Sequence, residues 1–298
     1  MSMLLLSALL LGVEAGFLAG EVKPVADGFQ FTEGPLWLPS GELIFSDIPA
    51  DTIYRGNKTV FRHPSGQSNG LTLDLEGRLI AAEHKNRRLS RTNADGVVET
   101  LADRYDGKRF NSPNDVIVRS DGMVFFTDPP YGLEGGLGGP NDELGFSGVY
   151  AVSPAGDVKL LVKDFQRPNG LALSPDEKTL YIADTQAGHI RAFDVAADGT
   201  LSNDRVLCAI RGPDGMKVDV KGNIWCTGGA GVEIFSPSGE TLQSIRFPQA
   251  PANCTFGDDD GKTLYVTART GVYKVRTTVE GIRPAGRLRP ASDVRAAE

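Results

Sequence analysis

The sequence predicts an all-β fold in which six similar units close into a six-bladed β-propeller. Three observations predict it. Six tight turns each carry a carboxylate or amide residue, and the first apolar residue of a short β-like run follows each of them ten or eleven residues later. Successive turns are 36 to 55 residues apart, a loose period in the range of propeller blades with loops of variable length. No amphipathic run of helical period is longer than the apolar stretch at the N-terminus, so β-hairpins account for the repeats.

Each unit has the pattern of a strand, a turn and a second strand. In the first unit, residues 34–38 and 42–46 form such a pair, and a third segment follows at 52–55. The runs that we assign to the inner strands are apolar at successive positions, as in Leu180–Ala183, which favours burial on both faces by neighbouring blades. A closed ring needs its last blade completed by both ends of the chain, and residues 21–29 are our candidate for the closing strand.

The six turn residues share an oxygen-bearing side chain and nearly the same distance from the run that follows. They are Glu33, Asn69, Asn114, Asn169, Asp214 and Asn253. Hydrogen bonds to the local backbone explain a single Asn or Asp in a turn, but they give no reason for a fixed register with a downstream strand. If six units surround an axis, these side chains converge on one place. Carboxylate and amide oxygens bind hard divalent ions, so the pattern predicts a central metal site.

Acidic residues also stand four positions after the first apolar residue in four of the six units. They are Asp47, Glu83, Asp128 and Asp184. Such residues either line the channel and support the metal ligands, or hydrogen-bond to the next blade. We expect Asp128 to contact the substrate, because residues 127–131 lead directly into the Gly-rich segment 131–143. That segment lacks the Lys-Ser/Thr pair of a phosphate-binding loop, and we interpret it as a flexible rim loop, either a lid or a plain solvent loop.

The composition argues against several classes of function. A net charge of −7 and a pI of about 5.1, with no basic cluster outside residues 85–91, argue against nucleic acid as a partner. Cys208, Cys226 and Cys254 are too few and too scattered for a zinc site or a disulfide framework, so we expect buried free thiols. The histidines show no triad partner, which argues against a serine hydrolase. We expect His84, at a strand end, to be structural.

The N-terminal segment has two interpretations. Residues 3–13 are apolar and end near small residues that suit a signal cleavage site, but no Lys or Arg precedes them. The stretch is too short to span a bilayer, so no membrane association is expected. We divide the chain into an N-terminal apolar strap or signal segment at 1–20 and one propeller domain at 21–298. We expect a cytoplasmic protein that is a monomer or weak homo-oligomer; a functional signal peptide would make it secreted or periplasmic.

Several stretches taken together resemble the SMP-30/gluconolactonase family of six-bladed β-propellers. The matching stretches are residues 31–35, 108–115, 126–132, 168–172, 214–216 and 253–256. They are spread over nearly all of the chain, and together they are specific although a single Pro-Asn-Gly is not. The resemblance implies that Glu33, Asn169 and Asp214 bind a divalent cation, with Asn114 as a fourth ligand or a substrate-binding neighbour. Calcium is the expected ion, and Mg²⁺, Mn²⁺, Zn²⁺ and Fe²⁺ are the alternatives.

The resemblance also implies a reaction, the hydrolysis of sugar lactones such as gluconolactone to the sugar acid, a step of carbohydrate metabolism. The cation would polarise the lactone carbonyl, and Asp214, both a ligand and a nearby base, would activate the attacking water. Asn69 and Asn253, which one ion cannot also bind, are assigned to substrate contact or to support of the ligands. Arg109 is assigned to the sugar hydroxyls or the developing carboxylate. The alternatives are a metal-dependent phosphotriesterase or esterase of the same fold, and a non-catalytic ligand-binding propeller.

Overall fold

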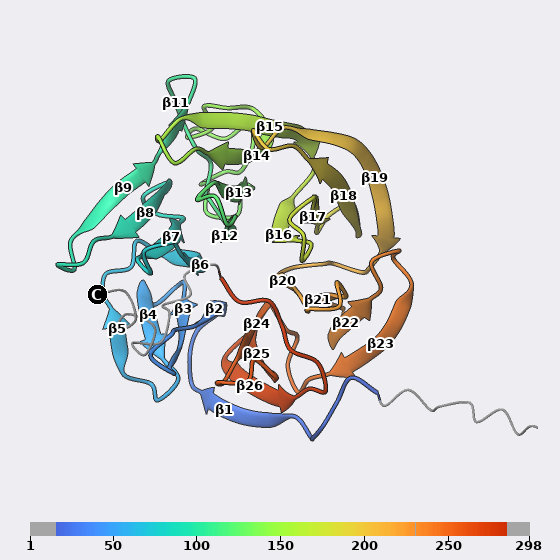
Figure 1. The fold of residues 1–298 in the computed structure, drawn as a ribbon. Helices are drawn as coiled ribbons and strands as arrows, with labels where there is room; N and C mark the ends of the chain where they lie inside the picture. Colours follow the sequence, from blue (N-terminus) through green and yellow to red (C-terminus); the bar gives the residue numbers. More distant parts are fainter. Residues whose placement is uncertain (1–15, 230, 285–298) are drawn as a thin grey trace, which may run out of the picture.

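The computed structural model describes residues 16–229 and 231–284 of the 298-residue chain. Within them, six four-stranded antiparallel sheets are arranged around a central axis like the blades of a propeller (Figure 1). The predicted all-β six-bladed propeller is confirmed. No helix in this part of the chain is long and apolar enough to cross a membrane.

Each sheet is one blade, and in the first five blades the strands follow one another from the axis outward in chain order (Figure 1). Blade one consists of β2 (Thr32–Trp37), β3 (Leu43–Asp47), β4 (Thr52–Arg55) and β5 (Val60–Arg62). Blade two consists of β6 (Ser68–Leu73), β7 (Leu79–Glu83), β8 (Arg88–Thr92) and β9 (Val98–Ala102). Blade three consists of β12 (Val116–Val118), β13 (Val124–Asp128), β14 (Ser147–Val152) and β15 (Val158–Phe165). Blade four consists of β16 (Pro168–Leu173), β17 (Thr179–Asp184), β18 (His189–Val195) and β19 (Leu201–Ala209). Blade five consists of β20 (Met216–Val218), β21 (Ile224–Gly228), β22 (Gly231–Phe235) and β23 (Thr241–Arg246). Blade six consists of β24 (Asn253–Gly257), β25 (Thr263–Ala268), β26 (Gly271–Arg276) and β1 (Lys23–Asp27). A hairpin of β10 (Arg104–Tyr105) and β11 (Lys108–Arg109) lies in the chain between blades two and three.

The two ends of the described chain close the ring in blade six. Strand β1 pairs antiparallel with β26, with Lys23 opposite Lys274 and Asp27 opposite Gly271. The predicted closing strand at residues 21–29 is therefore confirmed. Residues 16–20 continue along the same blade, where the backbone N–H of Ala19 donates to a carbonyl of β26 at 2.8 Å. The first fifteen residues of the predicted N-terminal segment lie outside the described residues.

The strands nearest the axis are not the apolar runs that the sequence suggested. The innermost strands are β2, β6, β12, β16, β20 and β24, and the apolar runs are the second strands of the blades (Figure 1). The expected burial on both faces holds for them, since Leu180, Ile182 and Ala183 of β17 are completely buried. A second strand has partners on both edges and a neighbouring blade on each face, so it needs apolar side chains on both sides.

Aromatic contacts join neighbouring blades. Trp225 of β21 is completely buried, and its ring meets Phe256 of blade six edge-on at 5.2 Å between ring centroids. Trp37 of blade one stacks on Tyr265 of blade six at 5.1 Å, across the junction where the ring closes. Each aromatic pair adds stability beyond the area that it buries, so these contacts help to hold the blades in a fixed circle.

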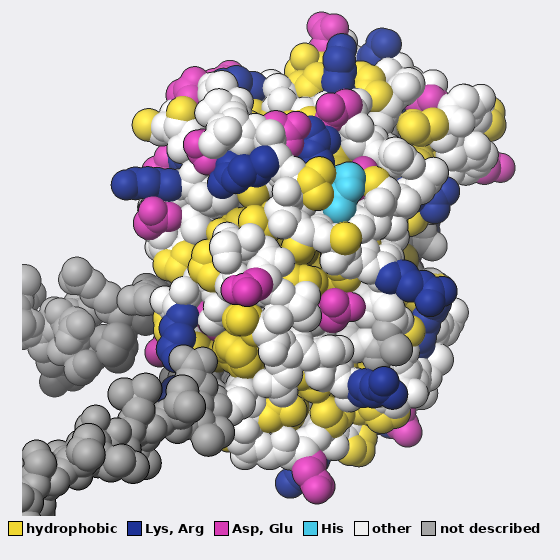
Figure 2. All heavy atoms as spheres, turned by 90° about the vertical axis from the view of Figure 1, so that its right-hand side faces the viewer, with side chains coloured by type: hydrophobic (Ala, Val, Ile, Leu, Met, Phe, Trp, Pro, Cys, Tyr) yellow, Lys and Arg dark blue, Asp and Glu magenta, His cyan; other side chains and the backbone are white. Residues whose placement is uncertain are grey.

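The outer surface carries charges of both signs. Figure 2 shows one side of the ring, where Lys and Arg side chains are interspersed with Asp and Glu and apolar atoms form separate patches. Single exposed apolar residues, such as Val206 and Leu242 on the outermost strands β19 and β23, are ordinary for a protein surface.

Acidic residues at the ends of the second strands hold the loops that enter their own blades. Both carboxylate oxygens of Asp128 accept backbone N–H bonds, from Asn111 and Ser112, each at 2.8 Å. Asp47 and Asp184 hold the corresponding loops of blades one and four in the same way. The bonds of these three residues lie within one blade. The expected hydrogen bonds to the next blade are therefore corrected.

The expected substrate contact of Asp128 stays a prediction. Its side chain is completely buried, and its two oxygens already serve as acceptors for the entry loop. The fourth member of the set, Glu83, differs because it pairs with the guanidinium groups of Arg62 and Arg88 at the rim. The acidic strand ends are therefore anchors of loops and ion pairs.

Replacing Asp128 should destabilise the fold. In Asp128→Ala two buried N–H groups lose their acceptor, at about 1–3 kcal/mol for each, so we expect the free energy of unfolding in urea to fall by roughly 2–4 kcal/mol. The exposed Asp95→Ala is the control and should change it by less than about 0.5 kcal/mol. Unchanged stability of Asp128→Ala together with a loss of ligand binding would instead support the predicted substrate role.

Candidate functional site

The six predicted residues lie at the same end of the axis, at the start of the innermost strands; we call Glu33, Asn69, Asn114, Asn169, Asp214 and Asn253 the ring residues. Four are inside these strands, and Asn114 and Asp214 come two residues before β12 and β20. Five are only 3–4% exposed, whereas Asp214 is partly exposed. The amide of Asn69 donates to Oδ1 of Asn114 at 2.8 Å, and further contacts link the others. The structure therefore brings the ring residues together.

Bonds between neighbouring blades fix the backbone of the ring. The N–H of Gly170 in blade four donates to the carbonyl oxygen of Asp214 in blade five at 3.0 Å. The hydroxyl of Thr127 in blade three donates to the carbonyl oxygen of Asn169 in blade four at 2.8 Å. Because a ring residue is held by the blade before it, its side chain is presented at a fixed height along the axis.

Glycine follows four of the ring residues because the inner strands approach one another too closely for a side chain. A Cβ on Gly170 would lie 2.3 Å from the carbonyl oxygen of Asp214. Gly34 has a φ of +46°, and a Cβ there would lie 1.9 Å from the carbonyl oxygen of Asn69. The pairing of β2, β6 and β16 also shifts in register directly after the ring residue. The apparent tight turns are thus bulged strand starts at close quarters.

The buried carboxylate of Glu33 and the half-buried carboxylate of Asp214 repel each other in the ring. Burial is the main cause that raises the pKa of Glu33 to about 7, and the negative charge of Asp115 adds to it, while a hydrogen bond from Gly34 lowers it. Burial also raises the pKa of Asp214 well above its usual value, and the charge of Glu33 raises it further. Both carboxylates are ionised at neutral pH only when a positive charge lies between them.

The donor atoms of the ring fit a hard divalent cation. Asn169 directs its amide N–H toward the hydroxyl of Thr185 at 3.0 Å, which leaves its Oδ1 free. Oδ1 of Asn69 is buried and has no hydrogen-bond partner among the described residues. No group of three or more His, Cys, Asp or Glu side chains in residues 16–229 and 231–284 is placed to hold a metal, so amide oxygens have to complete the set with Glu33 and Asp214. An all-oxygen set favours Ca²⁺, Mg²⁺ or Mn²⁺.

Two charged residues near the ring, Asp115 and Lys217, are absent from the predicted site. Asp115 is 2% exposed, and burial raises the pKa of its carboxyl, while the nearby ammonium of Lys217 lowers it. Lys217 in β20 donates to the carbonyl oxygen of Met216 at 2.9 Å. The negative charge of Asp115 adds to those of Glu33 and Asp214, and the positive charges of Lys217 and Arg269 partly offset them. Asp115 could have been predicted as a site residue because it directly follows Asn114, but no sequence pattern distinguishes Lys217.

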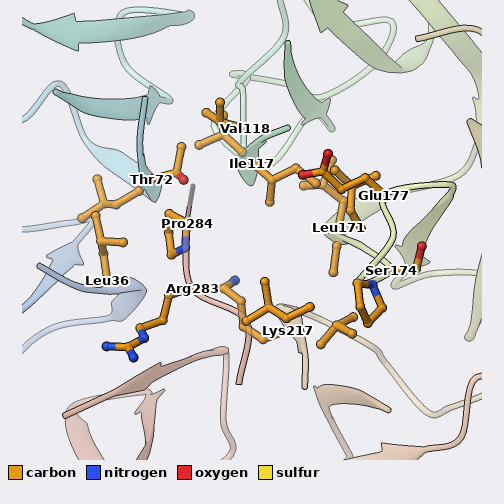
Figure 3. A pocket seen from close by; sticks show the side chains of 17 residues that line it. Leu36, Thr72, Ile117, Val118, Leu171, Ser174, Glu177, Lys217, Arg283 and Pro284 are labelled. Carbon is orange, nitrogen blue, oxygen red and sulfur yellow. The ribbon is translucent and has the colours of Figure 1, made fainter. Parts of the chain in front are cut away.

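A mainly apolar cavity of about 120 Å³ lies farther along the axis (Figure 3). Leu36, which follows Glu33 by three residues in β2, lines it together with Ile117, Leu171 and Pro284. Lys217 also lines this cavity, whereas no ring residue does. The carboxylate and amide oxygens of the ring residues are therefore separate from this cavity.

Three residues at the mouth of the ring contact ring residues although they were not predicted as site residues. The amide of Asn169 donates to the hydroxyl of Thr185 and, at 3.4 Å, to the hydroxyl of Tyr131. Nε2 of His84 lies 3.4 Å from the amide nitrogen of Asn69. Burial lowers the pKa of His84 to about 4, so the imidazole is neutral at pH 7. These residues follow strand ends, where sequence patterns carry little signal.

An open groove of about 470 Å³ borders the ring between blades four and five. Thr185, Arg211 and Gly212 are among the residues that line it. Thr185 joins this groove to the mouth of the ring, because its hydroxyl accepts a hydrogen bond from the amide of Asn169.

Arg109 lies at the rim and not in the ring. Its guanidinium donates to the carbonyl oxygen of Asn86 at 3.2 Å, and its backbone N–H donates to the carboxylate of Glu143 at 2.8 Å. The hydrogen bonds that the described residues give Arg109 do not reach a ring residue. Its assignment to the substrate stays a prediction.

Comparison with known proteins gives consistent similarities. Residues 31–270 match the family described as the SMP-30/Gluconolactonase/LRE-like region. A gluconolactonase of Zymomonas mobilis is 34% identical over 295 residues, which cover 87% of this chain and 82% of that protein. A solved structure of a gluconolactonase from Xanthomonas campestris is 34% identical with a TM-score of 0.81, over 89% of this chain and 93% of that one. Regucalcin of Oryctolagus cuniculus is 29% identical over 80% of this chain and 84% of its own length.

The close approach at the ring predicts the effect of a single methyl group. Gly170→Ala places a Cβ against the backbone of Asp214, so we expect a loss of about 1–3 kcal/mol in unfolding free energy and weaker cation binding by calorimetry. In the control Gly56→Ala the new Cβ meets only ordinary contacts at 3.5 Å, and both quantities should stay close to those of the wild type. Equal effects of the two substitutions would contradict the proposed packing.

The raised pKa of Glu33 predicts how the cation-free protein responds to pH. The native state keeps this proton up to about pH 7, whereas the unfolded chain releases it near the ordinary value of 4.5. Between these values the native state binds more protons, so a rise in pH favours unfolding. In chelator, Tm should fall as the pH rises from about 5 to 8, and Glu33→Gln should flatten this slope. A Tm that rises across this range would contradict a raised pKa of Glu33 in the cation-free protein.

Proposed function

The chain belongs to the SMP-30/gluconolactonase/LRE-like family and hydrolyses sugar lactones, and we propose that the ring residues are the active site of this lactonase. The observation that carries the proposal is the pair of mutually repelling carboxylates, buried Glu33 and half-buried Asp214, set among amide oxygens at one end of the axis. The similarity to gluconolactonases over most of the chain supports a small sugar lactone as the substrate.

Glu33, Asn169 and Asp214, with Asn114 beside them, are the residues that would hold a divalent cation. The two carboxylates supply the charge, and the amide oxygens complete an all-oxygen set. When bound, the cation would act as a Lewis acid that polarises the lactone carbonyl. Calcium fits this set best, because it accepts more oxygen ligands in a less regular geometry than Mg²⁺ does.

Asp214 is the acid of the ring that can exchange a proton with the substrate. It is partly exposed beside the open groove, whereas Glu33 is 3% exposed. In the reaction, the oxygen of a water molecule bonds to the carbonyl carbon, and the bond from that carbon to the ring oxygen breaks. Asp214 takes a proton from the water and returns it to the departing ring oxygen, so its carboxylate is regenerated. With the cation bound, its carboxylate is ionised and can accept a proton.

Asn69 and Asn253 fit the support of the ligands better than direct contact with the substrate. Asn69 donates to Oδ1 of Asn114, and Asn253 hydrogen-bonds to the carboxylates of Glu33 and Asp115. These bonds orient the donor atoms of the ring toward its centre. Removing either amide is therefore expected to weaken cation binding first.

Removing the cation and replacing Asp214 test the proposal. After chelation, hydrolysis of gluconolactone should fall to the spontaneous rate, and Ca²⁺ or Mn²⁺ should restore it. Asp214→Asn should lower kcat by about 10²- to 10⁴-fold in a folded protein, whereas the surface variant Asp95→Asn should keep full activity. A pH-indicator assay over a panel of lactones and organophosphate esters, with the spontaneous rate subtracted, measures each effect.

Two results of this assay would overturn the proposal. Chelated protein that works at the cation-loaded rate would exclude the proposed role of the ring. Turnover of organophosphate esters without turnover of any lactone would replace the substrate class.

A further inference from the structure

We propose that Tyr131 contacts the substrate and that its phenol donates a hydrogen bond to the lactone carbonyl oxygen as that oxygen gains negative charge. The proposal rests on the lactonase function above and adds a residue to it. Tyr131 belongs to the Gly-rich segment after β13, which we interpreted from the sequence only as a rim loop.

The hydroxyl of Tyr131 lies at the ring and is accessible. Its oxygen accepts a hydrogen bond from the amide of Asn169 at 3.4 Å, and the hydroxyl of Thr185 lies beside it. Since the phenol oxygen is an acceptor in the contact with Asn169, its own proton is available for an oxygen of a bound molecule. Tyr131 is 40% exposed, so a substrate that enters the ring can touch it.

The chain on both sides of Tyr131 is held in place. The hydroxyl of Ser112 donates to the carbonyl oxygen of Pro129 at 2.6 Å and accepts the N–H of Gly132 at 2.8 Å. The guanidinium of Arg167 lies 5.5 Å from the centre of the Tyr131 ring, a distance at which a cation is attracted to the aromatic face. The phenol is therefore positioned before substrate arrives.

Gly132 lets the loop lie directly on the His84 ring. A Cβ at this position would be 2.7 Å from Cβ and 2.9 Å from Cγ of His84. His84 is 6% exposed and contacts Asn69 on its other side. The segment thus spans the mouth of the ring from the His84 side, in blade two, to Asn169, in blade four. A side chain at Gly132 would lift the segment and move the phenol away from Asn169.

The phenol of Tyr131 is a neutral donor. A phenol has an ordinary pKa of about 10, so the hydroxyl carries its proton at neutral pH. A protonated hydroxyl beside the acid can stabilise negative charge on a reacting oxygen without transferring a proton. A positioned donor of this kind commonly contributes about 10²- to 10³-fold to kcat, and partial exposure to solvent reduces that value.

The test separates a transition-state contact from a structural one. Tyr131→Phe keeps the ring and removes the donor, so kcat for gluconolactone should fall about 10- to 100-fold while KM changes by less than about 3-fold. The calcium affinity by calorimetry and the shape of the pH profile should match those of the wild type. The control Tyr105→Phe, a half-buried tyrosine on the nearby hairpin, should keep full activity.

A second substitution tests the positioning by Gly132. Gly132→Ala should lower kcat by a similar factor, and the double variant with Tyr131→Phe should show little further loss, because both remove the same hydrogen bond. An unchanged kcat in Tyr131→Phe, or a rise in KM alone, would overturn the contact with the carbonyl oxygen. Additive losses in the double variant would overturn the positioning role of Gly132. Wild-type protein that hydrolyses no lactone would overturn the proposed function and this inference together.

Discussion

The repulsion between Glu33 and Asp214 is the constraint on which the site depends. Six strands that meet at one axis leave little room for water, so each carboxylate there loses hydration and gains a like-charged neighbour. A fold could avoid this cost with amides at all six positions. Two acids among four amides instead give the ring the negative charge that, as we propose, a divalent cation offsets.

The propeller meets this constraint with contacts that its neighbouring blades share. Glycines allow backbones to approach within hydrogen-bonding distance, and hydroxyls such as that of Thr127 hold the carbonyls of the next blade. Acidic residues such as Asp128 accept hydrogen bonds from the backbone of the loops that lead into the blades. The ring is thereby rigid, while the groups that face the substrate, Asp214 and Tyr131, are the ones that remain partly exposed. A preorganised active site requires a rigid backbone together with side chains that the substrate can reach.

The fold and the ring residues could be predicted because both follow from the repeat. A residue such as Asn169 keeps a fixed distance from its second strand, so its register survives changes in loop length. The loop-anchoring bonds of Asp128 could not be predicted, because an acidic strand end has the same sequence pattern whether it faces a channel or caps a loop. Tyr131 and His84 reach the ring from segments that belong to single blades, so no repeat marks them. Lys217 points toward the axis from a strand that local sequence describes only as apolar.

Proton release on cation binding tests the central claim most directly. Calorimetric titration of the chelator-treated protein with Ca²⁺ near pH 6.5, in buffers of different ionisation enthalpy, reports how many protons leave when the ion binds. The account predicts a single site whose binding releases protons in the wild type and fewer in Glu33→Gln, since Glu33 holds its proton up to about pH 7 without the ion. Binding with no proton release, or the same release in both proteins, would contradict it.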